Sequence, residues 1–289
     1  MLTLSEIKNK LLSIDKEFAI KRIVCAVQQY FRQVNAKYAV MGLSGGVDSS
    51  TTLAILTRAL DTDRIKCLIM PHSKITPKED TNDAVKLASQ YGIEPIIIEI
   101  DEIADSFKRK MENSGLDMNK LAYGNTLARI RMMILYSFAN SLNGLVVGSG
   151  DKSELLLGYF TKYGDGGVDI LPLGDLYKTQ VRMLAEYLGV PKKIAYKPSS
   201  PRLWQGQTAV EELGADYDVI DAILYAFIEL RKPLEEVFEI QGIQKSLIQS
   251  ILRRVFLNEH KRRFPFIPKL SPGMTIGIDW RVPRISKLI

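Results

Sequence analysis

Cysteine and histidine are scarce in this sequence, with two of each among 289 residues, and no long hydrophobic run is present. Two cysteines cannot form a disulfide framework, and with two histidines they cannot supply the ligands of repeated zinc modules. The most apolar stretch, around residues 96–98, is far too short to span a bilayer. The amino terminus has mixed charge and no apolar segment of signal-peptide length. These absences predict a reduced, cytoplasmic protein that does not bind membranes.

The composition that remains is that of an ordinary globular protein. Hydrophobic residues make up 46% of the chain and charged residues 25%, which excludes a disordered or collagen-like protein. The formal net charge of +6 is compatible with binding either nucleic acid or a phosphorylated small molecule. The chain contains no internal repeat and no low-complexity segment. We expect one domain over residues 1–289, with a carboxy-terminal extension from about residue 264 to residue 289.

Short apolar runs alternate with segments of helical spacing. The predicted strands are residues 38–43, 65–70, 95–100 and 145–147. The predicted helices are one or two within 4–32, then about 47–60, 78–91, a short one after residue 100, 119–142, 175–188, 216–230 and 243–257. Strands joined by helices of this length form right-handed crossovers and a parallel sheet. We therefore expect an α/β fold with a doubly wound, mostly parallel five-stranded sheet of order 3-2-1-4-5 and a helical carboxy-terminal region.

The most informative segment is Leu-Ser-Gly-Gly-Val-Asp-Ser-Ser at residues 43–50, between the first predicted strand and the next helix. Two glycines at such a turn let successive backbone N–H groups converge on an anion beside the positive end of a helix. The hydroxyls of Ser44 and Ser49 add donors. A carboxylate beside phosphates, here Asp48, makes sense only with a metal ion between them. A plain helix cap with a glycine turn is the simpler alternative, but the full pattern favours a phosphate site.

Two other motifs compete for this segment. No lysine follows the glycines, which excludes a P-loop of the G-x-x-x-x-G-K-[ST] kind. Residues 42–46 fit G-x-S-x-G, the nucleophile elbow of α/β hydrolases, with Ser44 as nucleophile and His260 as a late base. Only one strand precedes this elbow, and His260 lies in a highly charged stretch. The phosphate site is therefore the favoured interpretation.

The S-G-G-x-D-S pattern resembles the pyrophosphate-binding loop of the N-type ATP pyrophosphatases, which split ATP into AMP and pyrophosphate to adenylate a substrate. Further segments resemble one branch of that family, the ammonia-dependent NAD synthetases. These segments are G-N-T-L-A-R at 124–129, G-S-G-D-K-S-E-L-L-L-G at 148–158, T-K-Y-G-D-G-G-V-D at 161–169 and E-H-K-R-R at 259–263. Residues 201–208 resemble the mobile lid of the family, although Ala209 and Val210 follow where relatives often carry acids. The resemblance spans residues 20–263.

The resemblance implies that ammonia amidates deamido-NAD in an ATP-dependent reaction, giving NAD, AMP and pyrophosphate through an adenylated intermediate, with Mg²⁺ as cofactor. It implies catalytic roles for Asp48 and Lys178, and metal ligation by Asp48 and Glu154. The residues that it assigns to ATP are Gly42, Leu43, Ser44, Gly45, Gly46, Val47, Asp48, Ser49, Ser149, Lys178 and Ser199. The residues that it assigns to deamido-NAD are Arg129, Lys162, Asp169, His260 and Lys261.

The surroundings of two positions add independent expectations. Asp151 stands at the start of a predicted helix, where an acidic side chain suits the positive helix end, so we expect it to be a cap. The helix over residues 121–142 is apolar almost all round, which predicts that it is buried. A buried Arg129 on that helix would need an anionic partner.

The expected partners are ATP, deamido-NAD, ammonia and a second copy of the chain, with no nucleic acid. Glutamine-using relatives carry an amidase domain, for which this chain has no room, so free ammonia is the expected nitrogen source. The apolar surface of helix 121–142 predicts a homodimer with substrate sites at the interface. Two alternatives stay open. A tRNA-modifying ATP pyrophosphatase is disfavoured by the missing Cys-x-x-Cys. An adenine-nucleotide sensor would have no reason to retain Glu154, Lys162 and Asp169 together.

Overall fold

The computed structural model of the chain describes residues 2–270. At its centre lies a sheet formed by β1 (Tyr38–Gly42), β2 (Ile65–Ile69), β3 (Ile96–Ile97) and β4 (Gly144–Val146). The strand order is β3-β2-β1-β4, and each neighbouring pair is parallel. The predicted α/β class and the predicted order of the first four strands are therefore confirmed.

The expected fifth strand is reduced to a single bridge beside β4. Val147 pairs in parallel with Ile170, and the Gly148 N–H donates to the Ile170 carbonyl at 2.9 Å. Turns at residues 162–166 and 172–175 leave only a short extended segment around this bridge. Within residues 2–270 the sheet thus has four strands and one bridge at the place of the fifth.

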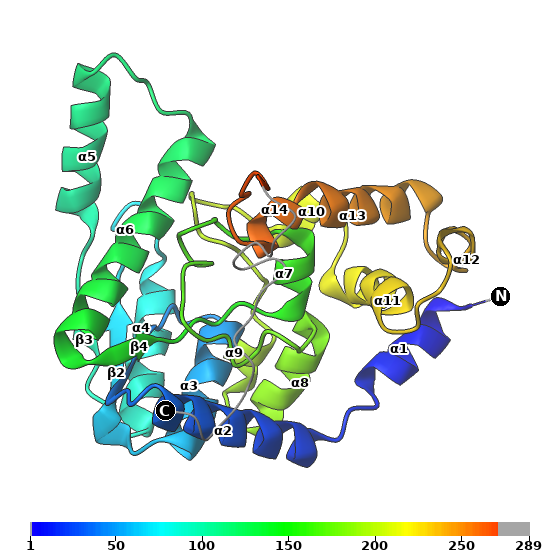
Figure 1. Cartoon of the computed structure of the whole chain (residues 1–289), viewed down its shortest axis with the longest axis horizontal. Helices are drawn as coiled ribbons and strands as arrows, with labels where there is room; N and C mark the ends of the chain where they lie inside the picture. The colour runs from blue at the N-terminus through cyan, green and yellow to red at the C-terminus, as the bar shows by residue number, and fades with distance from the viewer. Residues whose placement is uncertain (1, 271–289) are drawn as a thin grey trace.

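Helices cover both faces of the sheet (Figure 1). The helices α2 (Lys16–Gln33), α3 (Val47–Ala59) and α4 (Lys78–Gln90) pack on one face, and α5 (Asp101–Asn113) and α6 (Lys120–Leu142) pack on the other. Successive side chains of a strand point to opposite faces, so Met41 of β1 joins the first core and Val40 joins the second. Both side chains are fully buried, which explains why the strands appear in the sequence as continuous apolar runs.

The carboxy-terminal half of the described chain is helical, as predicted. Its elements are α7 (Lys152–Leu157), α8 (Lys178–Tyr187), α9 (Lys192–Ala195), α10 (Ala209–Leu213), α11 (Tyr217–Ile228), α12 (Leu234–Phe238), α13 (Lys245–Leu257) and α14 (Glu259–Arg262). The buried face of α11 forms the centre of a separate core with α1 (Leu4–Leu12) and α13. In Figure 1, α7 and α8 lie between this helical region and the sheet.

Most predicted helix boundaries agree with the structure to within a few residues. The helix α5 has 13 residues and is longer than the short helix expected there. The helices α9, α10 and α12 were not predicted, because segments of four or five residues are too short to show a helical period. No helix within residues 2–270 is both long enough and apolar enough to cross a bilayer. Most of the expected extension over residues 264–289 lies outside the described residues.

Candidate active site

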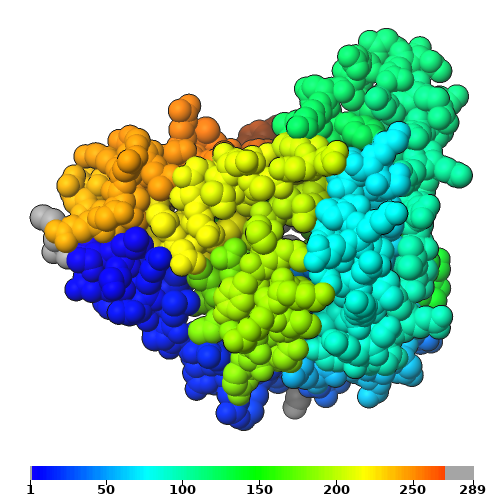
Figure 2. All heavy atoms as spheres, turned by 180° about the vertical axis from the view of Figure 1, so that it is seen from behind, coloured from blue at the N-terminus to red at the C-terminus, as the bar shows by residue number. Residues whose placement is uncertain are grey.

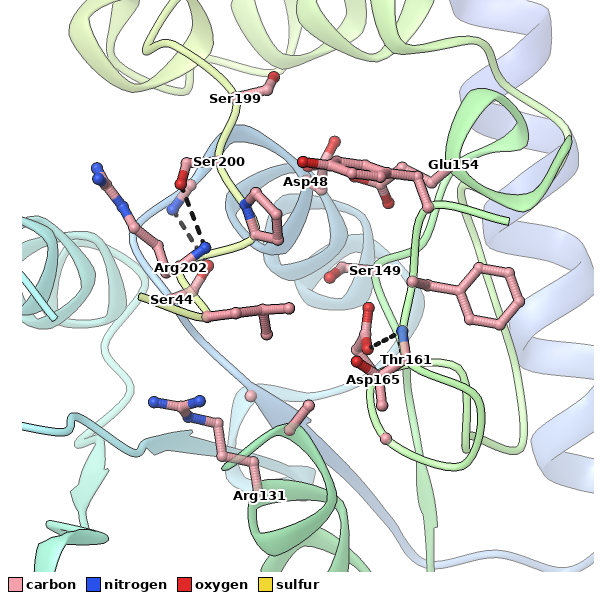
Figure 3. A pocket seen from close by; sticks show the side chains of 18 of the residues that line it. Ser44, Asp48, Arg131, Ser149, Glu154, Thr161, Asp165, Ser199, Ser200 and Arg202 are labelled. Atoms are coloured by element: carbon pink, nitrogen blue, oxygen red, sulfur yellow. Dashed lines mark hydrogen bonds between the residues drawn. The ribbon is translucent and has the colours of Figure 1, made fainter. Parts of the chain in front are cut away.

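The carboxyl ends of β1 and β4 open onto a cavity of about 780 Å³ (Figure 3). β2 lies on one side of β1 and β4 on the other. Where the order of the strands reverses in this way, a crevice forms at their carboxyl ends. The predicted ATP-binding residues that line the cavity are Gly42, Leu43, Ser44, Gly46, Val47, Asp48, Ser149 and Ser199. The other three, Gly45, Ser49 and Lys178, lie behind the lining and adjoin or contact it.

The loop after β1 has a backbone that only glycine fits at one position. Gly45 has φ of +77°, and a Cβ atom there would lie 2.2 Å from the carbonyl oxygen of Asp80. Gly46 precedes α3 as its N-cap, and no described side chain caps this helix start. The first N–H groups of α3 are therefore free to bind an anion at the positive end of the helix.

Replacing Gly45 by alanine is expected to destabilise the folded chain by about 2–3 kcal/mol, because the new Cβ adds a strained positive φ to a clash with backbone. Gly46→Ala is the matched control. Gly46 has no positive φ, and its Cβ would be 3.4 Å from the nearest atom, Ser44 Oγ. Chemical denaturation measures both variants. Equal stability of the two variants would contradict the strained geometry at Gly45.

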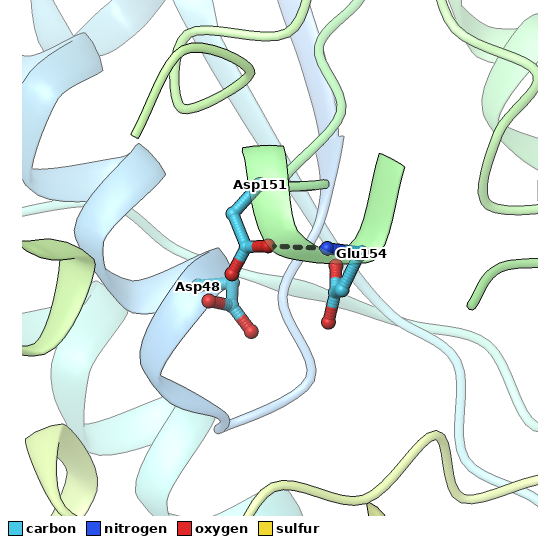
Figure 4. A group of neighbouring side chains, drawn as sticks. All are labelled: Asp48, Asp151 and Glu154. Carbon is cyan, nitrogen blue, oxygen red and sulfur yellow. Dashed lines mark hydrogen bonds between the residues drawn. The ribbon is translucent and has the colours of Figure 1, made fainter. Parts of the chain in front are cut away.

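Three carboxylates meet around one buried lysine beside the cavity. Lys178 Nζ lies 2.6 Å from Asp48 Oδ2, 2.9 Å from Asp151 Oδ2 and 2.8 Å from Glu154 Oε1. Figure 4 shows the three carboxylates converging from α3 and α7. We call Asp48, Asp151 and Glu154 the acidic cluster. With the ammonium of Lys178 included, three negative charges and one positive charge leave a formal charge of −2.

Helix starts position the members of this cluster. Asp48 lies in the first turn of α3. Asp151 is the N-cap of α7, where its Oδ1 accepts the N–H of Glu154 at 2.8 Å. Lys178 begins α8, and its backbone N–H donates to Ser153 Oγ at 2.9 Å. The predicted capping role of Asp151 is confirmed, but its second carboxylate oxygen also belongs to the cluster, which the sequence analysis missed.

Asp221 of α11 holds the starts of α7 and α8 together. Its Oδ1 accepts the hydroxyl of Ser153 at 2.6 Å, and its Oδ2 accepts the N–H and the hydroxyl of Thr179 at 2.8 Å each. The side chain is fully buried, and burial raises the pKa of Asp221 to about 7. The sequence showed no signal for this role, because Asp221 lies in a mostly apolar helix and belongs to no recognised motif.

The electrostatics of the acidic cluster favour added positive charge. Burial, together with the neighbouring carboxylates, raises the pKa of Glu154 well above its usual range and also raises the pKa of Asp151. Burial alone would lower the pKa of Lys178, but the carboxylates of Asp151, Asp48 and Glu154 outweigh it and raise this pKa well above its usual value. The lysine is therefore charged at neutral pH, and one ammonium does not neutralise three carboxylates.

The donor set fits a divalent metal ion. One oxygen from each member of the acidic cluster lies within 4.8 Å of the other two. Carboxylate oxygens are the ligands that Mg²⁺ prefers. Asp48 Oδ1 is buried and has no hydrogen-bond partner within the described part of the chain. An unpaired buried carboxylate oxygen in a cluster of net negative charge is available to a cation.

The end of α7 is capped from a distant part of the sequence. The ammonium of Lys261 lines the cavity and donates to the carbonyls of Gly158 and Phe160 at 2.6 and 2.8 Å. Arg262 Nη1 donates to two further carbonyls of α7, and Asn258 Nδ2 donates to the last one, at 2.6–3.0 Å. Carbonyls at a helix end need such donors. These residues therefore face inward and are not part of a solvated basic surface.

Four of the five residues assigned to deamido-NAD do not line the cavity. Arg129 Nη2 donates to the Lys162 carbonyl at 3.3 Å, and Lys162 Nζ donates to the His260 carbonyl at 2.9 Å. The three residues thus form a connected group on the outside. Asp169 accepts the hydroxyl of Tyr136 at 3.1 Å and the N–H of Val146 at 2.8 Å.

The expectation that Arg129 is buried is wrong. Arg129 and Met133 are exposed on the outer side of α6, because this helix covers the sheet with only one side. Arg131 lies two residues further along, about 200° round the helix, and it lines the cavity (Figure 3). Its Nε donates to the Met70 carbonyl at 2.9 Å, and burial lowers its pKa to about 10. Arg131 and Arg254 are cavity-lining arginines that sequence analysis missed.

Comparison with known proteins decides the family. The family model described as NAD synthase matches residues 19–265. The chain belongs to the NAD synthase family.

Three similar proteins match over nearly their whole lengths. The NH(3)-dependent NAD(+) synthetase of Saccharolobus solfataricus is 49% identical over 277 residues, which covers 95% of this chain and 97% of that protein. The NMN synthetase structure from Francisella tularensis has a TM-score of 0.77 at 31% identity and covers 89% of this chain and 99% of that one. The NH3-dependent NAD synthetase structure from Campylobacter jejuni has a TM-score of 0.73 at 29% identity and covers 89% and 100%.

Membership of the NAD synthase family confirms the family that the motifs indicated, a ligase that forms a C–N bond in NAD biosynthesis. The hydrolase alternative is wrong. Ser44 Oγ lies 3.0 Å from Ser49 Oγ, whereas the exposed side chain of His260 is not among the residues that line the cavity. The structure therefore does not bring His260, the base expected for a hydrolase, to this serine.

Proposed function

We propose that this protein makes NAD from deamido-NAD, ATP and ammonia, and releases AMP and pyrophosphate. The observation that carries the proposal is that one cavity combines the free helix start behind residues 43–46 with the acidic cluster. The helix start favours phosphate oxygens, and the cluster favours a cation beside them. Together they suit the phosphate chain of ATP.

The residues assigned to ATP have different roles according to their positions in the cavity. The loop of residues 42–46 and the first turn of α3 hold the phosphates, and Ser149 and Ser199 offer hydroxyls from other parts of the cavity wall (Figure 3). Asp48 and Glu154, joined by Asp151, hold Mg²⁺, which when bound supplies positive charge to the phosphate oxygens. The fixed ammonium of Lys178 reduces the repulsion between these carboxylates and the negative charge that gathers on pyrophosphate.

The nitrogen donor is free ammonia in this proposal. The two first relatives, from Saccharolobus solfataricus and Staphylothermus marinus, are both described as NH(3)-dependent NAD(+) synthetases, and this chain covers 97% and 94% of their lengths. Deamido-NAD is held by Lys261 at the cavity and by Arg129, Lys162, Asp169 and His260 outside it. We place the reaction in the cytoplasm, without a nucleic-acid or membrane partner.

The direct test is to incubate the protein with ATP, deamido-NAD and ammonium. We expect NAD, AMP and pyrophosphate in equal amounts, and a much slower reaction when glutamine replaces ammonium. ADP and orthophosphate as first products would contradict the proposal. A parallel incubation replaces deamido-NAD by nicotinic acid mononucleotide, because the matched Francisella tularensis structure is an NMN synthetase. Preference for the mononucleotide would transfer the proposal to that substrate.

We further propose a homodimer that uses the outer side of α5 and α6. These helices and the loop between them expose four large apolar side chains that do not line the cavity, Ile103, Phe107, Leu116 and Met133. Figure 2 shows that this part of the chain stands out from the rest of the molecule. A second copy would cover this apolar surface. It would also adjoin the connected group of Arg129, Lys162 and His260, which then serves a substrate site shared between subunits.

A mixing experiment tests the shared site. The Asp48→Asn chain and a chain carrying both Arg129→Ala and His260→Ala should each be weak alone. After co-refolding in equal amounts, half the dimers are mixed, and each mixed dimer has one site without a lesion. Activity should therefore return to about a quarter of the wild-type value. If light scattering shows a fully active monomer, the proposed dimer is wrong. If the protein is a dimer but mixing restores no activity, each site is formed within one chain.

A further inference from the structure

Tyr217, the first residue of α11, has a buried hydroxyl without a partner. The residue is 1% exposed, and no described group forms a hydrogen bond with its Oη. Buried tyrosine hydroxyls normally find a partner, since an unpaired buried donor is unfavourable. The ring is firmly packed in the core around α11, so the hydroxyl position is set by the fold. An unpaired donor at a fixed position points to a ligand that the site receives.

This hydroxyl belongs to the surroundings of the acidic cluster. Tyr217 lines the cavity together with Asp48 and Glu154, and Lys178 Nζ lies 5.3 Å from the centre of its ring. Burial first, and then the charge of Glu154, raise the pKa of Tyr217 well above its usual value. The hydroxyl therefore keeps its proton and is available as a donor.

An unpaired acceptor stands in the same site. Asp48 Oδ1 is buried without a partner, as the Tyr217 hydroxyl is, yet the two do not bond to each other. The oxygens of the cluster nearest Lys178 are already engaged by its ammonium. A cation beside Asp48 together with an oxygen acceptor beside Tyr217 would satisfy both atoms, and the charge of the cluster favours the cation. A phosphate oxygen bound together with a divalent cation provides both.

We propose that the Tyr217 hydroxyl donates a hydrogen bond to a phosphate oxygen of ATP when nucleotide and cation occupy the acidic cluster. The inference rests on the proposed function and adds a residue that the sequence motifs did not mark. Tyr217 is then a binding residue for the phosphate chain, and the unpaired hydroxyl is present before ATP arrives.

The chain offers a matched control in Tyr177. This residue is 2% exposed and belongs to the same core, but its hydroxyl donates to Glu229 Oε1 at 3.2 Å and it does not line the cavity. Tyr217→Phe removes a hydroxyl with no protein partner, and Tyr177→Phe removes one that is paired. Both variants keep the ring and its packing.

Thermal unfolding without ligand and calorimetric titration with Mg²⁺ and ATP, in the absence of deamido-NAD, test the inference. Tyr217→Phe should have an unchanged or higher Tm and bind ATP about tenfold more weakly, the loss expected for one hydrogen bond. Tyr177→Phe should have a lower Tm and unchanged affinity for ATP. A titration with Mg²⁺ alone should not distinguish Tyr217→Phe from the wild type.

The outcomes separate the inference from the proposed function. Equal affinity for ATP in Tyr217→Phe and the wild type would overturn the inference alone. A lower Tm in Tyr217→Phe would overturn it as well, since the hydroxyl would then have a partner in the protein. Weaker binding of Mg²⁺ alone would assign the hydroxyl to a water on the cation and overturn the phosphate contact. A wild-type chain that binds no ATP would overturn the proposed function itself.

Discussion

Lys178→Met is expected to lower turnover by about 100-fold and to destabilise the folded chain by about 3–5 kcal/mol at pH 8. The substitution keeps most of the side-chain volume but removes the only ammonium within 3 Å of all three members of the acidic cluster among the described residues. The buried Asp151 carboxylate and the partly buried Asp48 and Glu154 carboxylates are left without a counter-charge. The fixed positive charge that we propose for the phosphate site is lost as well. Steady-state rates and chemical denaturation measure the two effects.

The destabilisation by Lys178→Met should depend on pH. The pKa values of Asp151 and Glu154 are already raised in the folded chain, and loss of the ammonium raises them further. Above about pH 4 the folded chain then holds more protons than the unfolded chain, so its stability falls as pH rises. The loss should be smaller at pH 5 than at pH 8, and millimolar Mg²⁺ should recover part of it by binding the folded state.

Lys152→Met is the matched control. Lys152 pairs with Asp175 and Glu229 at 2.8 and 2.6 Å, and the side chains of these partners are 96% and 36% exposed. Solvent screens such pairs, so the expected change is below about 1 kcal/mol and the turnover should be near normal. Similar effects of the two substitutions would show that the Lys178 cluster has no special role.

Asp48→Asn and Glu154→Gln should each reduce turnover at least about tenfold, which corresponds to roughly 1.4 kcal/mol of transition-state stabilisation. Each substitution removes one carboxylate charge from the cation site. The folded chain should persist, since both side chains reach the cavity and are about one-fifth exposed. The rate is measured against Mg²⁺ concentration, and the Mg²⁺ requirement should rise in both variants.

Asp61→Asn is a suitable control for these two substitutions, because Asp61 is an exposed N-cap that forms no side-chain cap hydrogen bond. It should match the wild type at every Mg²⁺ concentration. Normal activity of Asp48→Asn or Glu154→Gln at limiting Mg²⁺ would remove that residue from the metal site.

The sequence predicted those features that depend on local periodicity and local motifs. The strands around β1 and β2 are buried on both faces and therefore appear as apolar runs, and the glycine loop needs only neighbouring residues to form. The position of Asp48 could also be predicted from its neighbours, because a carboxylate in the first turn after such a loop lies beside the anion site. The family resemblance added Glu154 and Lys178, which the structure brings to Asp48 from two other helices.

The features that were missed depend on contacts between distant segments. The sequence predicted that α6 is buried, because apolar residues also occupy its outer side. It therefore did not indicate that Arg131, and not Arg129, turns inward. Asp221 and Tyr217 lie one turn apart on α11 in an apolar context, and only the packing of α11 against α7 and α8 makes them part of the site. The predicted fifth strand does not form, because turns that contain glycine lie on both sides of Ile170 and leave only a short extended segment between them.

The capping of α7 by Asn258, Lys261 and Arg262 has a consequence for synthesis of the protein. These donors lie 101–107 residues after the carbonyls that they satisfy. A nascent chain emerges from the ribosome amino terminus first. The residues of the sheet can therefore fold while α7 still lacks these donors. Two of the three carboxylates of the cluster start this helix. A nascent chain therefore has the glycine loop long before the end of α7 has its donors. The proposed cation and ATP sites are complete only after residue 262 has emerged.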